Sequence, residues 1–328
     1  MNPLLPHGLQ HALVLDDGSR WIIAAGNDEA IPIVSQLADA MQLSVMNASA
    51  AQPLGWLETG STGGVEPPDH GIVRRLLIFL DAQNARAPLA MCHAPVPFEP
   101  FGDDGLFVCV LRSIPFSIGL YIHLVALSSV VAQDAQTRGG VLLHGALAEE
   151  DGIGVILAAP SRTGKTTASR RLLAPWRSLC DDTTLVVRDA QGNYWAHPWP
   201  TWSRFAEGAS GGSWDVQTAV PLRGIFFLSQ AVEDRVKSVG PGQAVSLLVE
   251  CAEQTSPPMA RDLSKKDART LRLERFNNIC TLAQVVPAHV LHISLTGAFW
   301  QQIEQTLEGR SRDTPVSSVS GTQSEISL

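Results

Sequence analysis

The chain has 328 residues, of which 45% are hydrophobic and 17% are charged, and its formal net charge at pH 7 is −8. This composition is typical of a globular protein with an ample core, and the length favours about two domains. A negative net charge argues against general nucleic-acid binding, which needs a basic surface, so no nucleic-acid partner is expected.

The five cysteines are scattered, and no two of them form a Cys-x-x-Cys pair. This pattern predicts neither a zinc site nor a disulfide framework, and it fits a reducing cytoplasm best. The amino terminus lacks the positive start and apolar core of a signal peptide, and no uninterrupted apolar run reaches about 18 residues. We therefore expect a cytoplasmic protein without membrane spans.

Residues 1–115 predict an α/β module of their own. Two apolar runs, 12–15 and 21–24, flank the turn-forming residues 16–19, which is a strong signal of a β-hairpin. No group of residues in this module indicates chemistry. The further elements expected here are a helix at 28–41, a loop at 47–72, and strands at 72–80 and 106–111.

Residues 116–308 predict a second module, in which strands and helices alternate after a first helix at about 116–135. Ser264 with Asp267 resembles a capping box that opens a later helix. Residues 309–328 are rich in Ser and Thr and predict a disordered tail. The apolar stripe expected in the later helix consists of Leu273, Phe276, Cys280 and Ala283. The strands expected in this module are 141–143, 155–158, 184–187, 222–228 and 290–295.

The segment 159–166 reads Ala-Pro-Ser-Arg-Thr-Gly-Lys-Thr and lies between a predicted strand and a helix predicted to begin at Thr167. That order is typical of a phosphate-binding loop, in which backbone N–H groups and a helix N-terminus face the phosphates. Gly164 would let the backbone approach closely, Lys165 would reach the outer phosphates, and the Thr166 hydroxyl would hold Mg²⁺. The nucleotide-binding residues expected are Ser161, Arg162, Thr163, Gly164, Lys165, Thr166 and Thr167.

The loop departs from the usual pattern at Ala159, where glycine is common. Alanine is tolerable there if its φ angle is negative. An ordinary strand-to-helix turn with a chance Gly-Lys-Thr is the alternative interpretation, and the flanking strand and helix favour the phosphate loop.

Asp181 follows Lys165 by sixteen residues and is itself followed by Asp182. This spacing allows one helix and a return strand, so the pair should lie at the carboxyl end of a neighbouring parallel strand, where open α/β sheets bind ligands. Adjacent carboxylates on an extended segment point in roughly opposite directions. One could orient and deprotonate an attacking hydroxyl while the other holds Mg²⁺; a turn or a helix cap is the alternative interpretation.

His144 and Gly145 follow the apolar run 141–143, so they lie within or beside a strand of the same module. A histidine there could hydrogen-bond a carboxylate or the transferred phosphoryl group, because its proton affinity can be tuned near neutral pH. A core histidine with satisfied hydrogen bonds is the alternative interpretation.

The order His144-Gly145, then 159–166, then Cys180-Asp181-Asp182 resembles the catalytic half of the HPr serine kinase/phosphatase family. The resemblance covers about residues 139–300. Within that family the chain looks closest to the HPr-kinase-like proteins of peptide-modification gene cassettes, including the SynChlorMet cassette protein ScmC and lasso-peptide kinases. The stretches that carry this closer resemblance are 142–146, 197–200, 221–228 and 287–291.

The resemblance implies a P-loop kinase domain with a central mixed sheet, ATP and Mg²⁺ as cofactors, and self-association into a homo-oligomer. It also implies roles for matching residues: Lys165 and Thr166 would bind phosphates and Mg²⁺, and Asp181 would be the base. Asp182 would be a magnesium partner and His144 would support phosphoryl transfer, so the catalytic residues expected are Asp181, His144 and Lys165.

HPr kinases also carry a Glu-Ile-Arg-Gly segment. Here Arg223 and Gly224 are kept, but Pro221 and Leu222 precede them and the glutamate is missing. This departure puts HPr as a substrate, and the phosphatase reaction, in doubt.

Two further groups of residues leave alternatives open. One is a run of cations that could dock an acidic peptide or form a solvated, salt-bridged helix face: Arg261, Lys265, Lys266, Arg269, Arg272 and Arg275. The other is a tryptophan cluster in an irregular segment, which could grip a peptide or pack onto the domain: Trp195, Trp199, Trp202 and Trp214.

The function expected is ATP- and Mg²⁺-dependent transfer of a phosphoryl group to a Ser or Thr hydroxyl of a peptide or protein, in the context of a ribosomally made precursor peptide. Two alternatives stay open. One is a nucleotide-binding ATPase or switch without an acceptor, and the other is a non-catalytic scaffold that binds a leader peptide.

Overall fold

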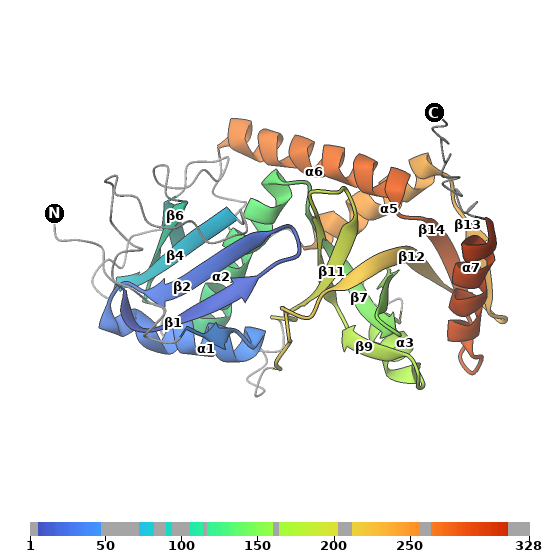
Figure 1. The fold of residues 1–328 in the computed structure, drawn as a ribbon, viewed down its shortest axis with the longest axis horizontal. Helices are drawn as coiled ribbons and strands as arrows, with labels where there is room; N and C mark the ends of the chain where they lie inside the picture. The colour runs from blue at the N-terminus through green and yellow to red at the C-terminus, as the bar shows by residue number, and fades with distance from the viewer. Residues whose placement is uncertain are drawn as a thin grey trace, which may run out of the picture.

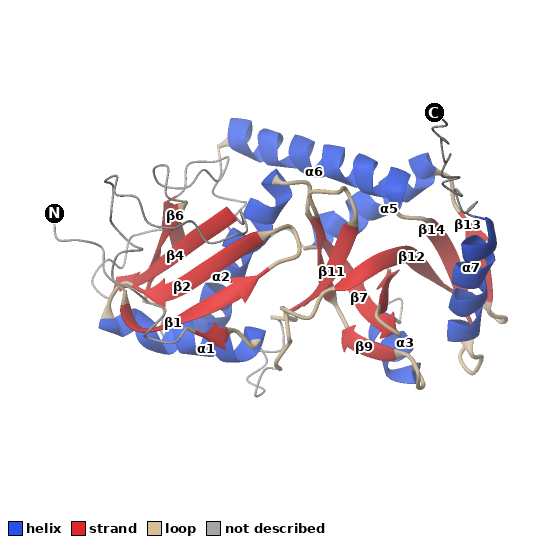
Figure 2. Ribbon diagram, in the orientation of Figure 1, coloured by secondary structure: helices blue, strands red, loops and turns tan. Residues whose placement is uncertain are grey.

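The computed structural model consists of two β-sheets with helices packed around them (Figure 1, Figure 2). The first sheet is built from residues before 113, and the second from residues after 140. The structure describes residues 6–46, 72–81, 90–93, 105–113, 117–159, 164–202, 212–255 and 264–313.

The amino-terminal sheet confirms the hairpin, the helix and the strands expected before residue 113. In chain order its elements are β1 (His7–Val14), β2 (Ser19–Ala25), η1 (Asp28–Ala30), α1 (Ile31–Met41), β3 (Ser44–Val45), β4 (Ile72–Asp81), β5 (Ala90–His93) and β6 (Leu106–Arg112). The strand order is β3-β1-β2-β4-β6-β5; β1 and β2 pair antiparallel, whereas β2, β4 and β6 run parallel. Trp21 packs against Phe107 with ring centroids 5.1 Å apart, in a core that includes the apolar side of α1. The loop expected at 47–72 lies outside the described residues except for Ile72.

Cys109 in β6 is disulfide-bonded, which differs from the expectation that no disulfide framework exists. The residue opposite Cys109 in the β5–β6 ladder is Cys92, whereas Cys180, Cys251 and Cys280 are free. Spacing along the chain could not indicate this bond, because only the pairing of two strands brings distant positions face to face.

The second sheet is mixed, as expected, because β8, β12 and β14 run parallel while β7, β10 and β13 pair antiparallel with their neighbours. Its strands are β7 (Val141–Glu150), β8 (Ile153–Ala158), β9 (Arg177–Cys180), β10 (Thr183–Arg188), β11 (Tyr194–Trp199), β12 (Val220–Gln230), β13 (Arg235–Ser238) and β14 (Ala288–Ile293). The order is β11-β10-β7-β8-β12-β14-β13, with β9 also paired to β7. β8 lies at the centre, and residues 155–158 are fully buried there. Its continuous apolar run is what burial on both faces requires.

The five strands expected in this half are present, and β7 is longer than expected. β9 is the return strand expected before Asp181, whereas β11 and β13 were not expected. β11 corrects the interpretation of the tryptophan-rich segment as irregular, because Trp195 and Trp199 belong to this strand. Trp199, Trp202 and Trp214 are buried, and Trp202 Nε1 donates to Ser128 Oγ at 2.7 Å. These three rings therefore pack the fold together.

The helices of this half are α2 (Ser117–Thr137), α3 (Lys165–Arg171), α5 (Pro241–Gln254), α6 (Lys265–Val285) and α7 (Phe299–Asp313). α6 runs along the top of both halves of the molecule and contacts α2 and α5 (Figure 1). α7 continues five residues past Glu308, so part of the expected disordered tail is helical. In the described part of the chain, no helix combines the length and the apolar character needed to span a bilayer.

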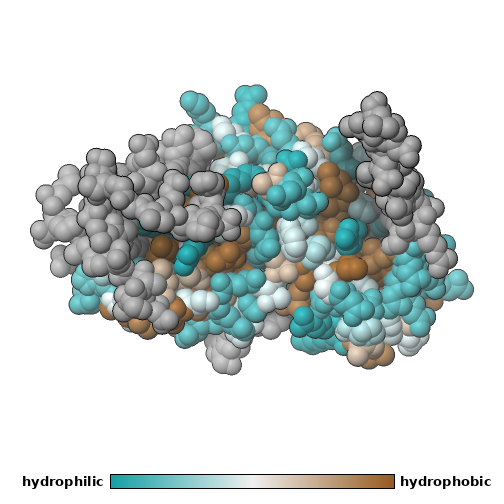
Figure 3. Space-filling model, in the orientation of Figure 1, coloured by the Kyte–Doolittle hydropathy of each residue, from teal (hydrophilic) through white to brown (hydrophobic). Residues whose placement is uncertain are grey.

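The capping box of α6 is confirmed, but its expected apolar stripe is not. Ser264 Oγ accepts a hydrogen bond from the Asp267 backbone N–H at 3.2 Å. Leu273 and Phe276 are 58% and 47% exposed, and apolar residues appear among polar ones along the upper edge of the molecule, where α6 runs (Figure 3). The residues of α6 that are buried are Leu271, Ile279, Leu282 and Ala283. Both sets have helical spacing, so only the packing partners decide which one is covered.

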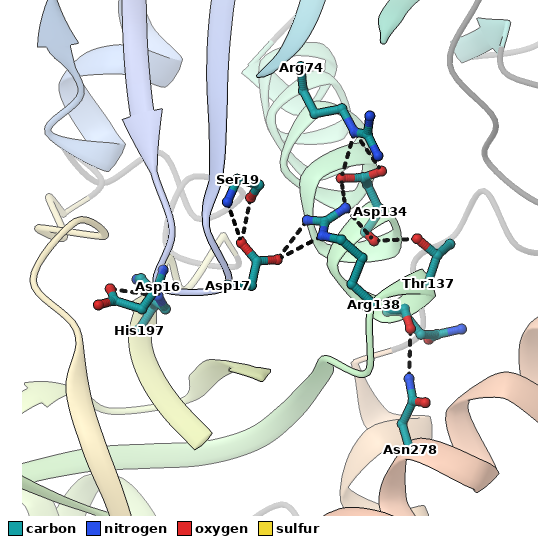
Figure 4. A network of polar contacts seen from close by, with 10 residues as sticks. Asp16, Asp17, Ser19, Arg74, Asp134, Thr137, Arg138, His197 and Asn278 are labelled. Carbon is teal, nitrogen blue, oxygen red and sulfur yellow. Dashed lines mark hydrogen bonds and ion pairs between the residues drawn. The ribbon is translucent and has the colours of Figure 1, made fainter. Parts of the chain in front are cut away.

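A buried ion cluster joins the two halves of the molecule just after α2 (Figure 4). Arg138 Nη2 donates to Asp17 Oδ2 at 2.7 Å, and Arg138 Nη1 donates to the Asp134 carboxylate. Arg74 Nε donates to the same Asp134 carboxylate at 3.2 Å. The side chains of Asp17 and Asp134 are each 1% exposed. Burial disfavours the Arg138 cation, but the two carboxylates outweigh this effect and raise the pKa of Arg138.

His197 in β11 forms a second contact with the hairpin turn. Its Nδ1–H donates to the Val216 carbonyl at 2.8 Å, and its Nε2 accepts from the Asp16 backbone N–H at 3.3 Å. Both hydrogen bonds use the neutral ring. Burial lowers the pKa of His197, and the nearby Asp16 carboxylate only partly offsets this shift.

This depressed pKa predicts that the protein is destabilised by mild acid. As the pH falls below about 6.5, an unfolded histidine binds a proton that the folded His197 resists, so stability is present above that pH and is lost below it. One such proton is worth at most about 1.4 kcal/mol per pH unit. Urea unfolding is expected to give a lower free energy of unfolding at about pH 5.5 than at about pH 7.5. This difference should shrink in His197→Gln and persist in the exposed control His7→Gln. An equal difference in all three proteins would contradict the assignment of the acid sensitivity to His197.

Candidate functional site

The expected phosphate loop lies between the end of β8 and the start of α3. Ala159 is buried and its φ is not positive, so the condition for alanine at this position is met. Gly164 has φ +108°, a left-handed conformation that any side chain would strain. α3 begins at Lys165, two residues earlier than expected, and ends at Arg171. The loop residues outside the described part, for which the contacts stay predictions, are Ser161, Arg162 and Thr163.

The side chain of Lys165 turns back toward the end of β8. Its Nζ donates to the Ala159 carbonyl at 2.8 Å, and the residue is 6% exposed. Burial lowers the pKa of Lys165, and the attraction of Asp182 and then of Cys251 only partly offsets this. An approaching anion stabilises the charged form of a buried ammonium whose pKa is depressed, so this position suits a phosphate chain. Thr166 and Thr167 follow in the first turn of α3, half-buried and exposed respectively.

Asp181 and Asp182 lie in a break between β9 and β10. These two strands pair one after the other with β7, and the two aspartates fall between them. As expected, the pair follows the carboxyl end of a strand that runs in the same direction as β8, namely β9. The expectation that this strand is the direct neighbour of β8 was wrong, because β7 lies between them and is antiparallel to both. The break takes both aspartates out of the ladder and leaves their side chains available for other partners.

The two carboxylates face different partners. Asp182 Oδ1 accepts from His144 Nε2 at 2.9 Å, and Asp182 exerts the largest electrostatic attraction on the Lys165 ammonium. Asp181 Oδ1 accepts from Thr201 Oγ1 at 3.2 Å. This geometry agrees with the expectation that adjacent carboxylates point in different directions.

His144 lies in β7, and both of its ring nitrogens have partners. Nε2 contacts Asp182, Nδ1 contacts Oε1 of Gln254, and the side chain is 12% exposed. The structure therefore brings His144 to the same place as Lys165 and Asp182. A Cβ on the following Gly145 would lie 2.6 Å from Ile156 Cγ2, so glycine is what lets β7 approach β8 closely here.

The last turn of α5 completes this site, and the sequence analysis missed it. Gln254 reaches His144, and Cys251 lies close enough to Lys165 for each to influence the charge of the other. Burial raises the pKa of Cys251 to about 11, so this thiol is neutral. A signal for α5 does exist: Pro241 at the first helical position, followed by buried residues at helical spacing, Ala244, Leu248, Cys251 and Ala252.

The Arg223-Gly224 segment does not join this site. Gly224 of β12 pairs with Val155 near the start of β8, whereas Lys165 follows the end of β8. Arg223 instead lines a separate cavity of about 730 Å³ together with Trp195 and other residues from β11, β12, α6 and α7.

Among the described residues, four cations of α6 form no ion pair: Lys265, Lys266, Arg269 and Arg272. Asp267, one of the acidic residues of this helix, bonds to Ser264 at the helix cap. Arg275 Nη1 donates to the Ala252 carbonyl at 3.3 Å, which ties α6 to the last turn of α5. The exposed cations are Lys265, Lys266, Arg269 and Arg272, whereas Arg261 lies outside the described residues.

The fold and the site define an α/β protein with mixed β-sheets, in which a buried lysine, a histidine and a carboxylate meet at the end of a central strand. A family model described as SynChlorMet cassette protein ScmC matches residues 107–308. The match covers more than half of the chain, so the chain belongs to the ScmC family, which confirms the cassette resemblance. The matched region contains every residue of the site. No curated protein matches the chain.

Proposed function

We propose that this protein is an HPr-kinase-like enzyme that uses ATP and Mg²⁺ to phosphorylate a Ser or Thr hydroxyl of a peptide or protein. The observation that supports this proposal best is that Lys165, Asp182 and His144 gather at the end of β8. The three residues come from motifs 38 residues apart at most, and their order along the chain resembles the catalytic half of HPr serine kinases.

In this proposal the side chains act by positioning and by charge, as in other phosphoryl transfers. Lys165 neutralises charge on the outer phosphates, and Asp181 orients the acceptor hydroxyl and takes its proton. Thr201 holds one oxygen of Asp181, and His144 holds one oxygen of Asp182. Each carboxylate is thereby kept in one orientation by its own partner.

The donors present fit a magnesium ion that enters together with the nucleotide. Mg²⁺ prefers oxygen ligands and is usually held by one or two protein groups together with phosphates and water. Thr166 and Asp182 would supply a hydroxyl and a carboxylate oxygen. The described residues contain no group of three His, Cys, Asp or Glu side chains suited to a metal. When bound, the ion would neutralise phosphate charge.

A peptide acceptor is proposed because the chain belongs to a family of cassette proteins and resembles kinases of peptide-modification cassettes. A ribosomally made precursor peptide encoded in the same cassette is the first substrate to test. The cytoplasm, where ATP and such a precursor meet, is the proposed location.

The test is to incubate the protein with ATP, Mg²⁺ and candidate precursor peptides and to analyse the peptides by mass spectrometry. One added phosphoryl group on a Ser or Thr is expected. Release of free phosphate without a phosphorylated peptide would identify a nucleotide-driven switch instead. An unchanged pathway product in a strain that carries Lys165→Ala would identify a leader-peptide-binding scaffold.

The role of Asp181 gives a sharper prediction. Asp181→Asn is expected to lower kcat by about 10²- to 10⁴-fold, because a general base is lost, while ATP affinity by calorimetry is retained. The matched control Asp28→Asn changes an aspartate whose side chain is 82% exposed and should keep full activity. Wild-type kcat in Asp181→Asn would rule out this base.

A further inference from the structure

Gln254 is the one side chain bonded to His144 that no motif indicated. It is the last residue of α5, and its Oε1 contacts His144 Nδ1 while His144 Nε2 faces Asp182. The end of α5 is held in place on both sides. Thr255 Oγ1 donates to the Leu142 carbonyl of β7 at 3.1 Å, and Arg275 of α6 donates to the Ala252 carbonyl.

The chemistry of the three groups limits where the ring protons lie. The Asp182 carboxylate only accepts hydrogen bonds, so His144 Nε2 must carry a proton to bond with it. Nδ1 is then the second atom by which the ring can be held. A glutamine amide can bond to it from either end, because exchanging its NH₂ and its oxygen makes it a donor or an acceptor.

We propose that Gln254 is a positioning residue for His144: by bonding to Nδ1 it holds the ring in the orientation that directs Nε2–H at Asp182. This inference rests on the proposed phosphoryl transfer, because a fixed Asp182 matters only if that carboxylate serves the reaction. Gln254 bonds to His144, whereas the Lys165 ammonium bonds to the Ala159 carbonyl, so Gln254 acts through the histidine. Partners of this kind typically contribute about 10- to 100-fold at comparable sites.

Gln254 is exposed, and this bounds the size of the effect. Water can take the place of a lost amide at an exposed position, so the expected loss lies at the lower limit, about tenfold. The same exposure means that its replacement removes no core packing, and variants are expected to fold as the wild type does.

The first arm of the test reads the ring protons directly. The chain has nine histidines, so ¹⁵N-histidine spectra of the full-length protein can be assigned to His144 by comparison with His144→Gln. The wild type is expected to show a protonated Nε2. Gln254→Leu is expected to let the ring turn away from Asp182 and therefore to give a mixture of the two tautomers.

The second arm measures phosphoryl transfer. Gln254→Leu is expected to lower kcat about tenfold without changing the KM for ATP. The matched control is Gln284→Leu, which changes an exposed glutamine on α6 and should alter neither the His144 spectrum nor kcat.

The two arms separate this inference from the proposed function. An unchanged His144 spectrum in Gln254→Leu overturns the inference, and so does a changed spectrum with wild-type kcat. If the wild type transfers no phosphoryl group to any acceptor, the proposed function fails, and the positioning role that rests on it fails as well. The spectra then still report whether Gln254 sets the tautomer.

Discussion

Replacement of Lys165 by methionine is expected to reduce phosphoryl transfer by a factor on the order of 10³ and to weaken ATP binding. The ammonium group lies at the end of β8, turned toward the loop through its hydrogen bond to Ala159. Its loss removes positive charge from the place where the outer phosphates are proposed to lie. Kinetics with the phosphopeptide as readout, together with calorimetry of ATP binding, would measure both effects.

Stability separates a lost function from a damaged fold in this experiment. Burial already lowers the pKa of Lys165, so removing the charge removes a desolvation cost, and Lys165→Met is expected to unfold at the same temperature as the wild type or above it. The exposed Lys237 of β13 provides the control, since Lys237→Met should leave activity and stability unchanged. Normal turnover in Lys165→Met would exclude the phosphate-loop interpretation.

Replacement of Arg138 by methionine is expected to destabilise the protein by about 3–5 kcal/mol. Arg138 is the cation between Asp17 and Asp134, whose side chains are each 1% exposed. Methionine would leave the Asp17 carboxylate buried without this partner and would leave Asp134 with Arg74. Urea denaturation gives the difference in the free energy of unfolding directly.

A matched surface variant tests whether this loss comes from the cluster. Arg235→Met changes an exposed arginine of β13 and should shift stability by no more than about 0.5 kcal/mol. Adding Asp17→Asn to Arg138→Met is expected to recover part of the stability, because the buried charge is removed as well. A loss below about 1 kcal/mol in Arg138→Met would mean that water already solvates the cluster.

The elements with strong local patterns were predicted well. The hairpin of β1 and β2 follows from a turn between two apolar runs, and the Ser264 capping box placed the start of α6 correctly. The prediction of the buried face failed where two sets of apolar residues on one helix had equally good spacing. Along α6, Leu273 and Phe276 have the same helical spacing as the residues that are buried, and only the contacts with α2 and α5 select one face.

The candidate site was predicted in part. Lys165, Asp182 and His144 were chosen from the sequence and lie together, whereas Arg223 belongs to the opposite end of the parallel strands. Gln254 was not found, because a lone glutamine at the end of a helix carries no motif. Its contact with His144 depends on α5 packing across β7.

By itself the sequence determined many of the short segments that form strands, turns and helices, and which family the chain belongs to, because backbone preferences and motif order are properties of neighbouring residues. The tertiary structure alone decided that β9 and β10 share β7 as a partner, which places Asp182 against His144 and within electrostatic reach of Lys165. It also decided that α5 covers this corner and that Arg138 lies between two buried carboxylates. Such contacts join residues tens to more than a hundred positions apart, and they form only when burial of the whole core selects one arrangement of the sheet over its alternatives.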